Sequence, residues 1–463
     1  MLYAAVDLGG SSGRVTVGKL EDSKITLTEV HRFRHEPMQN DAGLFWDWKF
    51  IVGQVMKGLE SACQLGPIKS VGVDSWAVDY GLINQKGEVI GQPHCYRDSR
   101  TDGLMAKLKS NLGTSYIYSR TGIQFIFFNT MYQLFAEKNS SIYGLADKFL
   151  MVPDLINYLL CGSISTEITN ASTTQLLNIH TRDWDWQLIE KLGIKKELFP
   201  KINKPKQQMG LVKGHGILDG IKVISVGSHD TASAVAGTPL PESGDCAYIS
   251  SGTWSLVGLE LRSPVTDKKA MEFNITNEMG VEDRIRFIKN VAGMWLLEES
   301  LDYWAAKGEH YTAAQLATAA AVLPKAAIID ANDVRFEKPG AMPERIIAMC
   351  HESNQPTPKT PAQFARCIFD SLADAYVKVI DQLQATSGVK VKSINIVGGG
   401  SANKLLNQLT ANATRKTVYA GPFDATVLGN LITQMQADGV VDSLEQGRQI
   451  IKNSFMQEVY KPT

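Results

Sequence analysis

The feature that most constrains the fold is a strand–turn–strand pattern that occurs near the start of each half of this 463-residue chain. In the first copy, apolar residues 2–8 lead into a turn rich in glycine and serine, and residues 15–20 alternate as a second strand. In the second copy, residues 246–249 lead into Ser250-Ser251-Gly252-Thr253, and another apolar strand ends at Val257-Gly258. One such hairpin is ordinary, but one at the start of each half predicts a duplicated architecture of two lobes.

The turn of the first hairpin has a composition that suits phosphate. Glycines let the backbone approach a ligand closely, and serine hydroxyls and free N–H groups donate to phosphate oxygens. Arg14 adds a cation, and Asp7, at the end of the first strand, could hold Mg²⁺, usually through waters. A hairpin tip of this kind is most often only a turn. No Gly-Lys-Ser/Thr follows, so the segment is not a Walker motif.

A candidate catalytic carboxylate lies almost at the midpoint of the chain. The apolar run 223–226 is typical of a short buried strand, Gly227 allows a sharp turn, and His229 and Asp230 precede a run of small residues that begins a helix. Open α/β sheets place their chemistry between a strand end and a helix N-terminus. The alternative is that Asp230 only caps the helix. This stretch alone favours the cap.

Polar residues gather in two further segments between the hairpins. Asp74 and Asp79 bracket a turn that contains Trp76. Residues 93–101, Pro-His-Cys-Tyr-Arg-Asp-Ser-Arg-Thr, are dense in side chains that could bind a polyol. The alternative for the second segment is an Arg–Asp network that opens the helix predicted near 101–110.

A run of three glycines follows a predicted strand in the second half. Residues 394–397 are apolar, and Gly398-Gly399-Gly400 lead into a helix N-terminus, a position for contact with an anion or an adenosine. Asn403 stands where the dinucleotide-binding fingerprint requires a third glycine, so the segment departs from that motif. Further helices are predicted over 44–65, 131–137, 154–160, 293–307, 311–323, 361–385 and 424–436.

Composition excludes several classes of function. A formal charge of -1, from 47 Lys+Arg against 48 Asp+Glu, gives no electrostatic case for nucleic acid or an acidic membrane surface. No apolar run approaches a membrane-spanning length, and the N-terminus lacks the layout of a signal peptide. The six cysteines have neither a CxxC pair nor zinc-ligand spacing, so we expect free thiols in the cytoplasm.

Four motifs together resemble the FGGY carbohydrate kinases. They are Asp7-x-Gly-Gly-Ser-Ser-x-Arg14, Gly227-Ser-His-Asp-Thr-Ala-Ser-Ala234, Ser250-Ser-Gly-Thr253-Trp254 and Gly398-Gly-Gly-Ser-Ala-Asn403. The resemblance runs from residue 3 to about residue 430, with the motifs in the family's order and spacing. It implies an α/β fold of the two-domain actin-like, ribonuclease-H-like type, with duplicated mixed sheets flanked by helices around a central cleft. The domains implied are 1–240, for sugar binding and the catalytic aspartate, and 241–463, for nucleotide binding.

The resemblance also implies a role for each matching residue. Asp230 would be the general base, Asp7 would support Mg²⁺, and ATP would be the phosphoryl donor. The implied substrate-binding residues are Ala77, Asp79, Arg97, His229, Thr231 and Asn290, and the implied ATP-binding residues are Gly10, Ser11, Ser12, Gly13, Arg14, Thr253, Gly399, Gly400 and Asn403. Two positions depart from the family pattern: Ala77 stands where a glycine is usual beside the sugar, and Glu298 where a glutamine is expected near the nucleotide.

The sugar-facing motifs most resemble those of family members that phosphorylate L-rhamnulose at its carbon-1 hydroxyl. A kinase for L-fuculose or xylulose is the alternative within the family. Outside it, a sugar-binding regulator without turnover and an actin-like ATPase that acts as a filament or chaperone are the remaining hypotheses. We expect a small-molecule ketose as the partner, no nucleic acid or membrane, and a monomer or homodimer.

Overall fold

The computed structural model describes residues 1–336 and 338–463, which divide into two compact units. Unit 1 comprises Met1–Gly237, Leu261–Phe287 and Thr426–Ser454, and unit 2 comprises Thr238–Glu260, Ile288–Ala425 and Phe455–Thr463. The boundary expected at residue 240 lies close to the end of the first segment of unit 1. Segments 261–287 and 426–454, which the expected division assigned to the second domain, belong instead to unit 1.

A six-stranded mixed sheet forms the centre of unit 1, in the order β14-β15-β6-β1-β2-β3. Its strands are β14 (Gln208–Leu211), β15 (Lys222–Ile224), β6 (Ile68–Ser75), β1 (Leu2–Leu8), β2 (Ser12–Glu21) and β3 (Lys24–Arg34). Strands β1, β6 and β15 are parallel, and β1–β2–β3 are antiparallel. Because β1 is covered on both faces, its residues form a nearly continuous apolar run rather than an alternating one.

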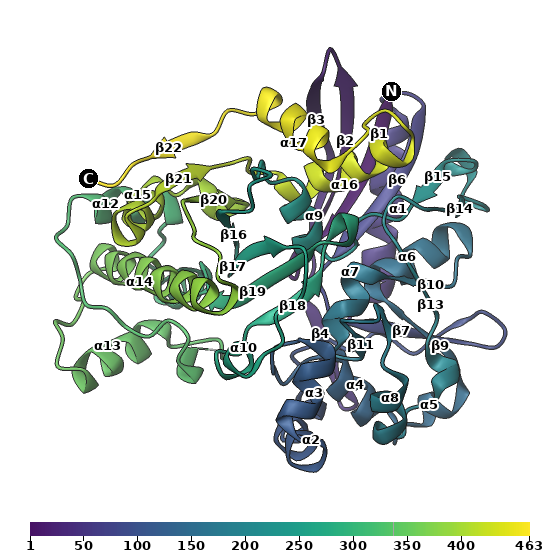
Figure 1. The fold of residues 1–463 in the computed structure, drawn as a ribbon, viewed down its shortest axis with the longest axis horizontal. Helices are drawn as coiled ribbons and strands as arrows, with labels where there is room; N and C mark the ends of the chain where they lie inside the picture. Colours follow the sequence, from purple (N-terminus) through teal and green to yellow (C-terminus); the bar gives the residue numbers. More distant parts are fainter. Residues whose placement is uncertain (337) are drawn as a thin grey trace. The chain divides into compact units, whose positions relative to one another are not determined.

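Helices cover both faces of this sheet. On one face, Gly58 of α1 (Trp48–Cys63) lies against Val15 of β2. On the other, Leu431 of α16 (Ala425–Ala437) lies against Gly18. Figure 1 shows α16 and α17 (Leu444–Ser454), coloured yellow, beside the purple strands from the start of the chain. The C-terminal part of the sequence therefore completes the core that the N-terminal strands begin.

Polar side chains of α16 fix it to the sheet. Asn430 Nδ2 donates to the carbonyl of Gly72 at 3.2 Å, and Gln434 Nε2 donates to that of Ala4 at 2.9 Å. Ser70 Oγ donates to Gln434 Oε1 at 2.7 Å. Asn430 and Gln434 are four positions apart, so both project from the same face of the helix. These buried hydrogen bonds explain why segment 426–454 returns to unit 1.

The rest of unit 1 consists of short strands and helices. The strands are β4 (Pro37–Asn40), β5 (Gly43–Trp46), β7 (Tyr80–Asn84), β8 (Val89–Ile90), β9 (Ala146–Met151), β10 (Ser165–Glu167), β11 (Leu177–Asn178), β12 (Asp183–Trp184), β13 (Lys201–Asn203) and β18 (Thr276–Met279). The helices are α2 (Leu104–Leu112), α3 (Thr114–Thr121), α4 (Thr130–Glu137), α5 (Ser141–Leu145), α6 (Val152–Cys161), α7 (Ile168–Ala171), α8 (Trp186–Leu192), α9 (Asp230–Ala236) and α10 (Lys268–Glu272).

Unit 2 repeats the strand arrangement of unit 1. Strand β16 (Cys246–Ser251) is antiparallel to β17 (Trp254–Leu261) and parallel to β20 (Ser393–Val397), as β1 is antiparallel to β2 and parallel to β6. Strands β21 (Thr417–Ala420) and β22 (Glu458–Tyr460) extend the sheet, and β19 (Ile285–Ala292) carries the chain from unit 1 into unit 2. The duplication predicted from the paired hairpins is confirmed.

Local sequence signals mark both ends of the longest helix of unit 2, whereas α13 (Met342–Glu352) was not predicted. The longest, α14 (Pro361–Ser387), starts with Thr360 as N-cap and Pro361 in its first turn, and ends at Gly388 in the left-handed conformation. The others are α11 (Trp295–Ala305), α12 (Ala313–Ala321), α13 (Met342–Glu352) and α15 (Lys404–Thr414), with α14 packed beside α12 and α15 (Figure 1).

One predicted helix is shorter than expected. Residues 44–46 of the segment 44–65 belong to β5, and α1 begins only at Trp48, because Asp47 accepts a hydrogen bond from the backbone N–H of Phe50 as an N-cap.

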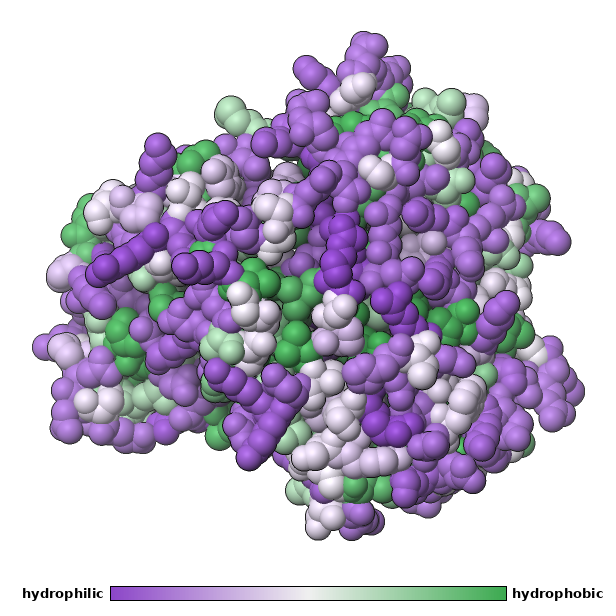
Figure 2. Space-filling model, in the orientation of Figure 1, coloured by the Kyte–Doolittle hydropathy of each residue, from purple (hydrophilic) through white to green (hydrophobic). Residues whose placement is uncertain are grey.

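At the surface, the face drawn in Figure 2 is mostly hydrophilic. Among the described residues, no helix is both long and apolar enough to cross a membrane. The six cysteines are free thiols in the structure.

Candidate active site

Asp230 lies at the junction between β15 and α9, as predicted. The N-cap position of α9 is occupied by His229, and Asp230 is the first residue of the helix. The interpretation of Asp230 as the N-cap is therefore wrong. Its side chain is 29% exposed, so the carboxylate remains accessible to a substrate.

The surroundings of Asp230 favour a base. Burial raises the pKa of the Asp230 carboxyl, the nearby His229 opposes this rise, and the charge of Asp7 adds to it. Thr231 Oγ1 donates to Oδ1 of Asp230 at 3.0 Å, and His229 Nε2 lies 3.4 Å from the same oxygen. A carboxylate with a raised pKa accepts a proton more readily than an ordinary surface aspartate.

A buried glutamate that no sequence motif indicated holds the turn before Asp230. Glu167, at the end of β10, is 1% exposed, and its Oε2 accepts from Ser228 N at 3.0 Å and from Ser228 Oγ at 2.8 Å. Thr169 N donates to Glu167 Oε1, and His229 N donates to Thr169 Oγ1 at 3.2 Å. The only signal for this role was that Glu167 is the sole Asp, Glu, Lys or Arg in the segment 162–181, since buried glutamates are rare unless they are hydrogen-bonded.

Two further carboxylates lie at the ends of neighbouring strands. Asp7 of β1 is paired with Asp74 of β6 in the parallel register. Asp7 Oδ2 accepts from Arg14 Nε at 2.9 Å and Nη2 at 2.8 Å, and Asp74 Oδ2 accepts from Asn430 Nδ2 at 2.6 Å. Burial and the charge of Asp7 raise the pKa of Asp74 well above its usual range. Arg14, expected at a phosphate, thus also neutralises Asp7.

The donor set around Asp7 suits a weakly held divalent cation. Among the described residues, no group of three or more His, Cys, Asp or Glu side chains could by itself hold a metal ion. Mg²⁺ usually binds proteins through one or two carboxylates, keeps several waters and takes its remaining ligands from substrate phosphates. Because Asp7 already pairs with Arg14, we expect it to reach such an ion through water.

Gly10 and Gly13 of the β1–β2 turn have different surroundings. A Cβ on Gly10 would lie 3.5 Å from the hydroxyl of Tyr96, an ordinary contact. A Cβ on Gly13 would lie 2.4 Å from Phe33 and 2.8 Å from Leu8. Gly13 is therefore required by the packing of the sheet, and only Gly10 is placed where the missing side chain could serve a ligand. Ser11 and Ser12 complete the turn, which is closed by the hydrogen bond from Gly9 N to Ser12 O at 2.8 Å.

Asp79, expected to contact the substrate, is instead enclosed by protein donors. It is 0% exposed. Oδ2 accepts from Trp46 Nε1 at 2.7 Å, Trp76 Nε1 at 3.0 Å and Tyr96 N at 3.1 Å, and Oδ1 accepts from Gln133 Nε2 at 3.0 Å. Burial raises the pKa of Asp79 to about 6, although these four donors oppose the rise. Asp79 therefore holds the indoles of Trp46 and Trp76 in position by accepting a hydrogen bond from each.

The aromatic residues around Asp79 form one cluster. The rings of Trp46 and Trp76 are 4.6 Å apart, and His35 lies within 5.3 Å of both. His35 Nε2 is 2.9 Å from the carbonyl oxygen of Gly9, in the β1–β2 turn. The cluster therefore connects the predicted sugar-facing residues with the predicted phosphate-binding turn within unit 1.

In the segment 93–101, Asp98 and Arg100 bond to other protein groups, whereas Arg97 is exposed. Asp98 Oδ1 accepts from Arg100 N at 2.8 Å, and Arg100 pairs with Glu137 and with Gln133 Oε1. The guanidinium of Arg100 thus pairs with Glu137 and Gln133 and not with an aspartate, so this network differs from the Arg–Asp network that was the alternative to polyol binding. Arg97 is exposed, with its guanidinium 5.3 Å from the centre of the Tyr96 ring. Arg97 and the half-buried Ala77 thus remain predicted substrate contacts.

In unit 2, the glycine run 398–400 lies against Ser251 at the end of β16. A Cβ on Gly400 would lie 1.9 Å from Ser251 Oγ, and one on Gly398, whose φ is +80°, would lie 2.9 Å from the Ser251 carbonyl oxygen. Packing therefore requires both glycines. A Cβ on Gly399 would meet only Phe423, at 4.0 Å. Gly399 is thus the position of the run with space for a ligand.

The other unit 2 residues of the predicted site lie around the β16–β17 turn and in neighbouring segments. The carbonyl of Thr253 accepts from the N–H groups of Gly293 and Trp295, which joins the turn to the start of α11. Asn403 Oδ1 caps α15 by accepting from Leu406 N at 3.0 Å. Asn290 Oδ1 is buried and has no hydrogen-bond partner among the described residues. Glu298 is exposed in the first turn of α11.

Comparison with protein families identifies both halves of the chain. The model of the N-terminal domain of the FGGY family of carbohydrate kinases matches residues 2–237, and the model of the C-terminal domain of the same family matches residues 247–437. Together the two models span most of the sequence. The second match includes both 261–287 and part of 426–454, the segments that the structure assigns to unit 1.

Curated relatives match over the whole chain. The rhamnulokinase of Mannheimia succiniciproducens is 42% identical over 463 residues, covering 99% of this chain and 94% of the relative. The rhamnulokinase of Bacillus subtilis is 41% identical over 468 residues, covering 100% of this chain and 96% of the relative.

Solved structures match the fold at low sequence identity. The ligand-bound xylulose kinase of Lactobacillus acidophilus has a TM-score of 0.81 at 19% identity, covering 100% of this chain and 94% of that one. The gluconate kinase of the same organism has a TM-score of 0.80 at 18% identity, with the same coverage. These similarities support the predicted actin-like, ribonuclease-H-like architecture.

Proposed function

Because the chain belongs to the FGGY family of carbohydrate kinases, we propose that it transfers the γ-phosphoryl group of ATP to the carbon-1 hydroxyl of L-rhamnulose. The observation that carries this proposal is the accessible, base-like carboxylate of Asp230 beside His229 at the end of β15. The choice of sugar is supported by full-length relatives named rhamnulokinase. L-fuculose and xylulose are the alternative substrates.

In the proposed reaction Asp230 accepts the proton of the carbon-1 hydroxyl while that oxygen attacks the γ-phosphorus and ADP leaves. His229 and Thr231, which flank Asp230, hold the sugar. The backbone N–H groups of the β1–β2 turn donate to phosphate oxygens, and in unit 2 Thr253 and Gly399 contact the nucleotide. A divalent cation, which we propose to be Mg²⁺, would neutralise phosphate charge near Asp7.

Three further properties belong to the proposal. We expect the enzyme to act in the cytoplasm, where ATP is present and free thiols persist. We expect a monomer or a homodimer. A sugar-binding regulator without turnover is disfavoured because Asp230 keeps an accessible carboxylate and a raised pKa, neither of which sugar binding alone requires.

Comparing kcat/KM for L-rhamnulose, L-fuculose, L-xylulose and D-xylulose, each with ATP and Mg²⁺, tests the choice of sugar. We expect L-rhamnulose to be preferred, because a pocket whose hydrogen-bonding groups are left unpaired by the wrong epimer rejects it. The methyl of Ala77, where relatives have glycine, is the feature that could shift the preference to a smaller ketopentose. A competitor preferred by about tenfold would refute the substrate and leave the kinase assignment intact.

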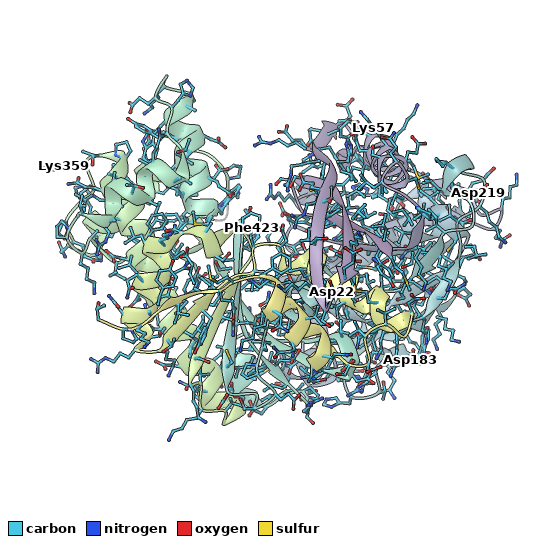
Figure 3. The ribbon with its side chains drawn as sticks, turned by 90° about the horizontal axis from the view of Figure 1, so that it is seen from above. Asp22, Lys57, Asp183, Asp219, Lys359 and Phe423 are labelled. Atoms are coloured by element: carbon cyan, nitrogen blue, oxygen red, sulfur yellow. The ribbon has the colours of Figure 1, made fainter. Side chains whose placement is uncertain are left out.

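Phe423 is a candidate for contact with the adenine ring. Phe423, labelled in Figure 3, follows β21 in unit 2 and is 53% exposed, and among the described residues its ring is what a Cβ on Gly399 would meet, at 4.0 Å. Stacking of a base on an aromatic side chain is worth about 1–3 kcal/mol. We therefore expect Phe423→Ala to raise the KM for ATP by about 5-fold to 100-fold and leave the KM for the ketose nearly unchanged.

The matched control for Phe423 is Met456→Ala, which removes another exposed apolar side chain of unit 2. It should change neither KM. An equal rise in both KM values for Phe423→Ala would indicate a general disturbance of the unit, and no rise in the KM for ATP would exclude the stacking contact.

A further inference from the structure

His229 belongs to a buried charge network that the proposed chemistry does not by itself require. Arg286 of β19 is 0% exposed, and Glu278 of β18 is 7% exposed; both belong to segment 261–287 of unit 1. Arg286 Nη2 lies 3.0 Å from His229 Nδ1 and 3.0 Å from Glu278 Oε2. Arg286 Nε donates to the carbonyl of Met279 at 3.0 Å, which fixes the guanidinium in place.

The two nitrogens of the His229 ring face groups of opposite hydrogen-bonding character. Arginine is always protonated and can only donate, so Nδ1 of His229 must accept the hydrogen bond from Arg286. Nε2 lies 3.4 Å from Asp230 Oδ1, a carboxylate oxygen that can only accept. Of the two neutral tautomers, the one with its proton on Nε2 suits both Arg286 and Asp230. The other tautomer would direct two N–H groups at each other on one side and two lone pairs at each other on the opposite side.

Glu278 balances the charge of Arg286 and also lies close to Nδ1 of His229. Burial would raise the pKa of Glu278, but the charge of Arg286 opposes this effect, and the pKa lies below its usual value. The ionised carboxylate therefore balances the buried guanidinium. Glu278 Oε2 also lies 3.2 Å from His229 Nδ1, where it could accept a proton if Arg286 did not donate to that nitrogen. Glu278 and Arg286 thus favour opposite tautomers of the same ring.

We propose that Arg286 is a positioning residue, which fixes the proton of His229 on Nε2 and through it orients the carboxylate of Asp230. With donors from His229 and Thr231 directed at Oδ1, the other oxygen, Oδ2, faces the hydroxyl of the sugar. The effect on turnover rests on the proposed role of Asp230 as general base, whereas the tautomer is inferred from the contacts of His229 with Arg286 and Asp230.

The tautomer can be observed directly by two-bond ¹H–¹⁵N NMR of protein labelled at histidine. The spectrum is taken at about pH 8, above the ordinary histidine pKa of about 6.5, and His229→Gln identifies the signal of His229. In the wild-type protein we expect an unprotonated Nδ1 and a protonated Nε2. In Arg286→Met, Glu278 becomes the remaining partner of Nδ1, and we expect the proton to move to Nδ1. A wild-type protein already protonated on Nδ1 would overturn the proposal.

Kinetics separate positioning from simple loss of structure. We expect Arg286→Met to lower kcat with L-rhamnulose by about 10-fold to 100-fold while the KM for ATP stays within about threefold, as for other residues that orient a functional histidine. The control is Arg284→Met, which removes another buried arginine of the same unit; it pairs with Glu445 and lies two positions from Arg286. It should change neither the tautomer nor, by more than about twofold, kcat.

A further variant guards against misfolding of Arg286→Met. Replacing both charges, in Glu278→Met/Arg286→Met, removes a buried ion pair, a change that is often neutral for stability. The double variant should fold, and because its His229 ring is held only through Asp230 and no longer through Nδ1, it should show a similar fall in kcat. A wild-type kcat in the folded double variant would contradict the positioning role. If no variant had kinase activity, the NMR result would still decide the tautomer.

Discussion

Replacing Asp230 with asparagine will lower kcat by about 100-fold to 10,000-fold, while the affinities for ATP and for the ketose change by only a few fold. Asparagine has almost the same shape, and its amide accepts hydrogen bonds but does not take up a proton at neutral pH. The function that is lost belongs to the transition state, in which the hydroxyl gives up its proton, so kcat falls and binding persists. Steady-state kinetics together with equilibrium binding of each substrate provide the measurement.

The control for this experiment is Asp22→Asn, an exposed aspartate at the turn between β2 and β3, labelled in Figure 3. Its φ of +48° is a conformation that asparagine also adopts readily, so fold and activity should be preserved. If Asp230→Asn keeps more than about a tenth of the wild-type kcat, Asp230 is not the general base.

Replacing Asp79 with alanine should destabilise unit 1 by about 3–5 kcal/mol, because each buried donor left without an acceptor costs about 1–3 kcal/mol. Four donors, from Trp46, Trp76, Tyr96 and Gln133, would lose their acceptor at once. Because two of these donors are indoles, tryptophan fluorescence during denaturation with urea will report the loss. Asp79→Asn retains one acceptor oxygen and should lose less, about 1–2 kcal/mol. A midpoint for Asp79→Ala equal to that of the wild type would show that the network contributes little.

The pH dependence of stability gives a second test of Asp79. Its pKa is raised to about 6 from the ordinary 3.8, so the folded state binds the proton more tightly than the unfolded state. The resulting stabilisation is complete below about pH 4 and is lost as pH rises through about 6, a difference of about 3 kcal/mol. Relative to Asp79→Asn, the wild-type protein should therefore lose stability between pH 4 and 7. A constant difference between the two proteins would mean that Asp79 does not titrate in this range.

Much of the fold could be predicted because local signals and hydrophobic pattern agree along the chain. The paired hairpins at 2–20 and 246–258 indicated the duplication, and α14 (Pro361–Ser387) begins at the predicted residue and ends two residues after the predicted end. The domain composition could not be predicted in this way. Segments 261–287 and 426–454 return to unit 1 through contacts distant in sequence, such as those of Asn430 with Gly72 and Asp74, and no local pattern records such contacts.

The predicted site likewise contains residues that local sequence signals reveal and residues that only contacts distant in sequence reveal. Asp230 was found because a strand end and a helix start can be recognised from neighbouring residues. The supporting residues Glu167 and Arg286 were missed because their partners lie about 60 positions away, as the separations of Glu167 from Ser228 and of Arg286 from His229 illustrate. Gly13 and Asp79 were assigned to ligands, but Gly13 is required by the ring of Phe33 and Asp79 is saturated by buried donors. Residue type alone does not distinguish a side chain that touches a ligand from one that supports its neighbour.

The most direct test of the central claim is to identify the product formed from L-rhamnulose and ATP. In ¹H-coupled ³¹P NMR, with ADP quantified in parallel, we expect one phosphate monoester coupled to the two protons of carbon 1, formed in equal amounts with ADP. Without the sugar, ADP release should be slow, because transfer of the phosphoryl group requires the hydroxyl acceptor. Release of inorganic phosphate at the same rate with and without L-rhamnulose would show an ATPase and contradict the account.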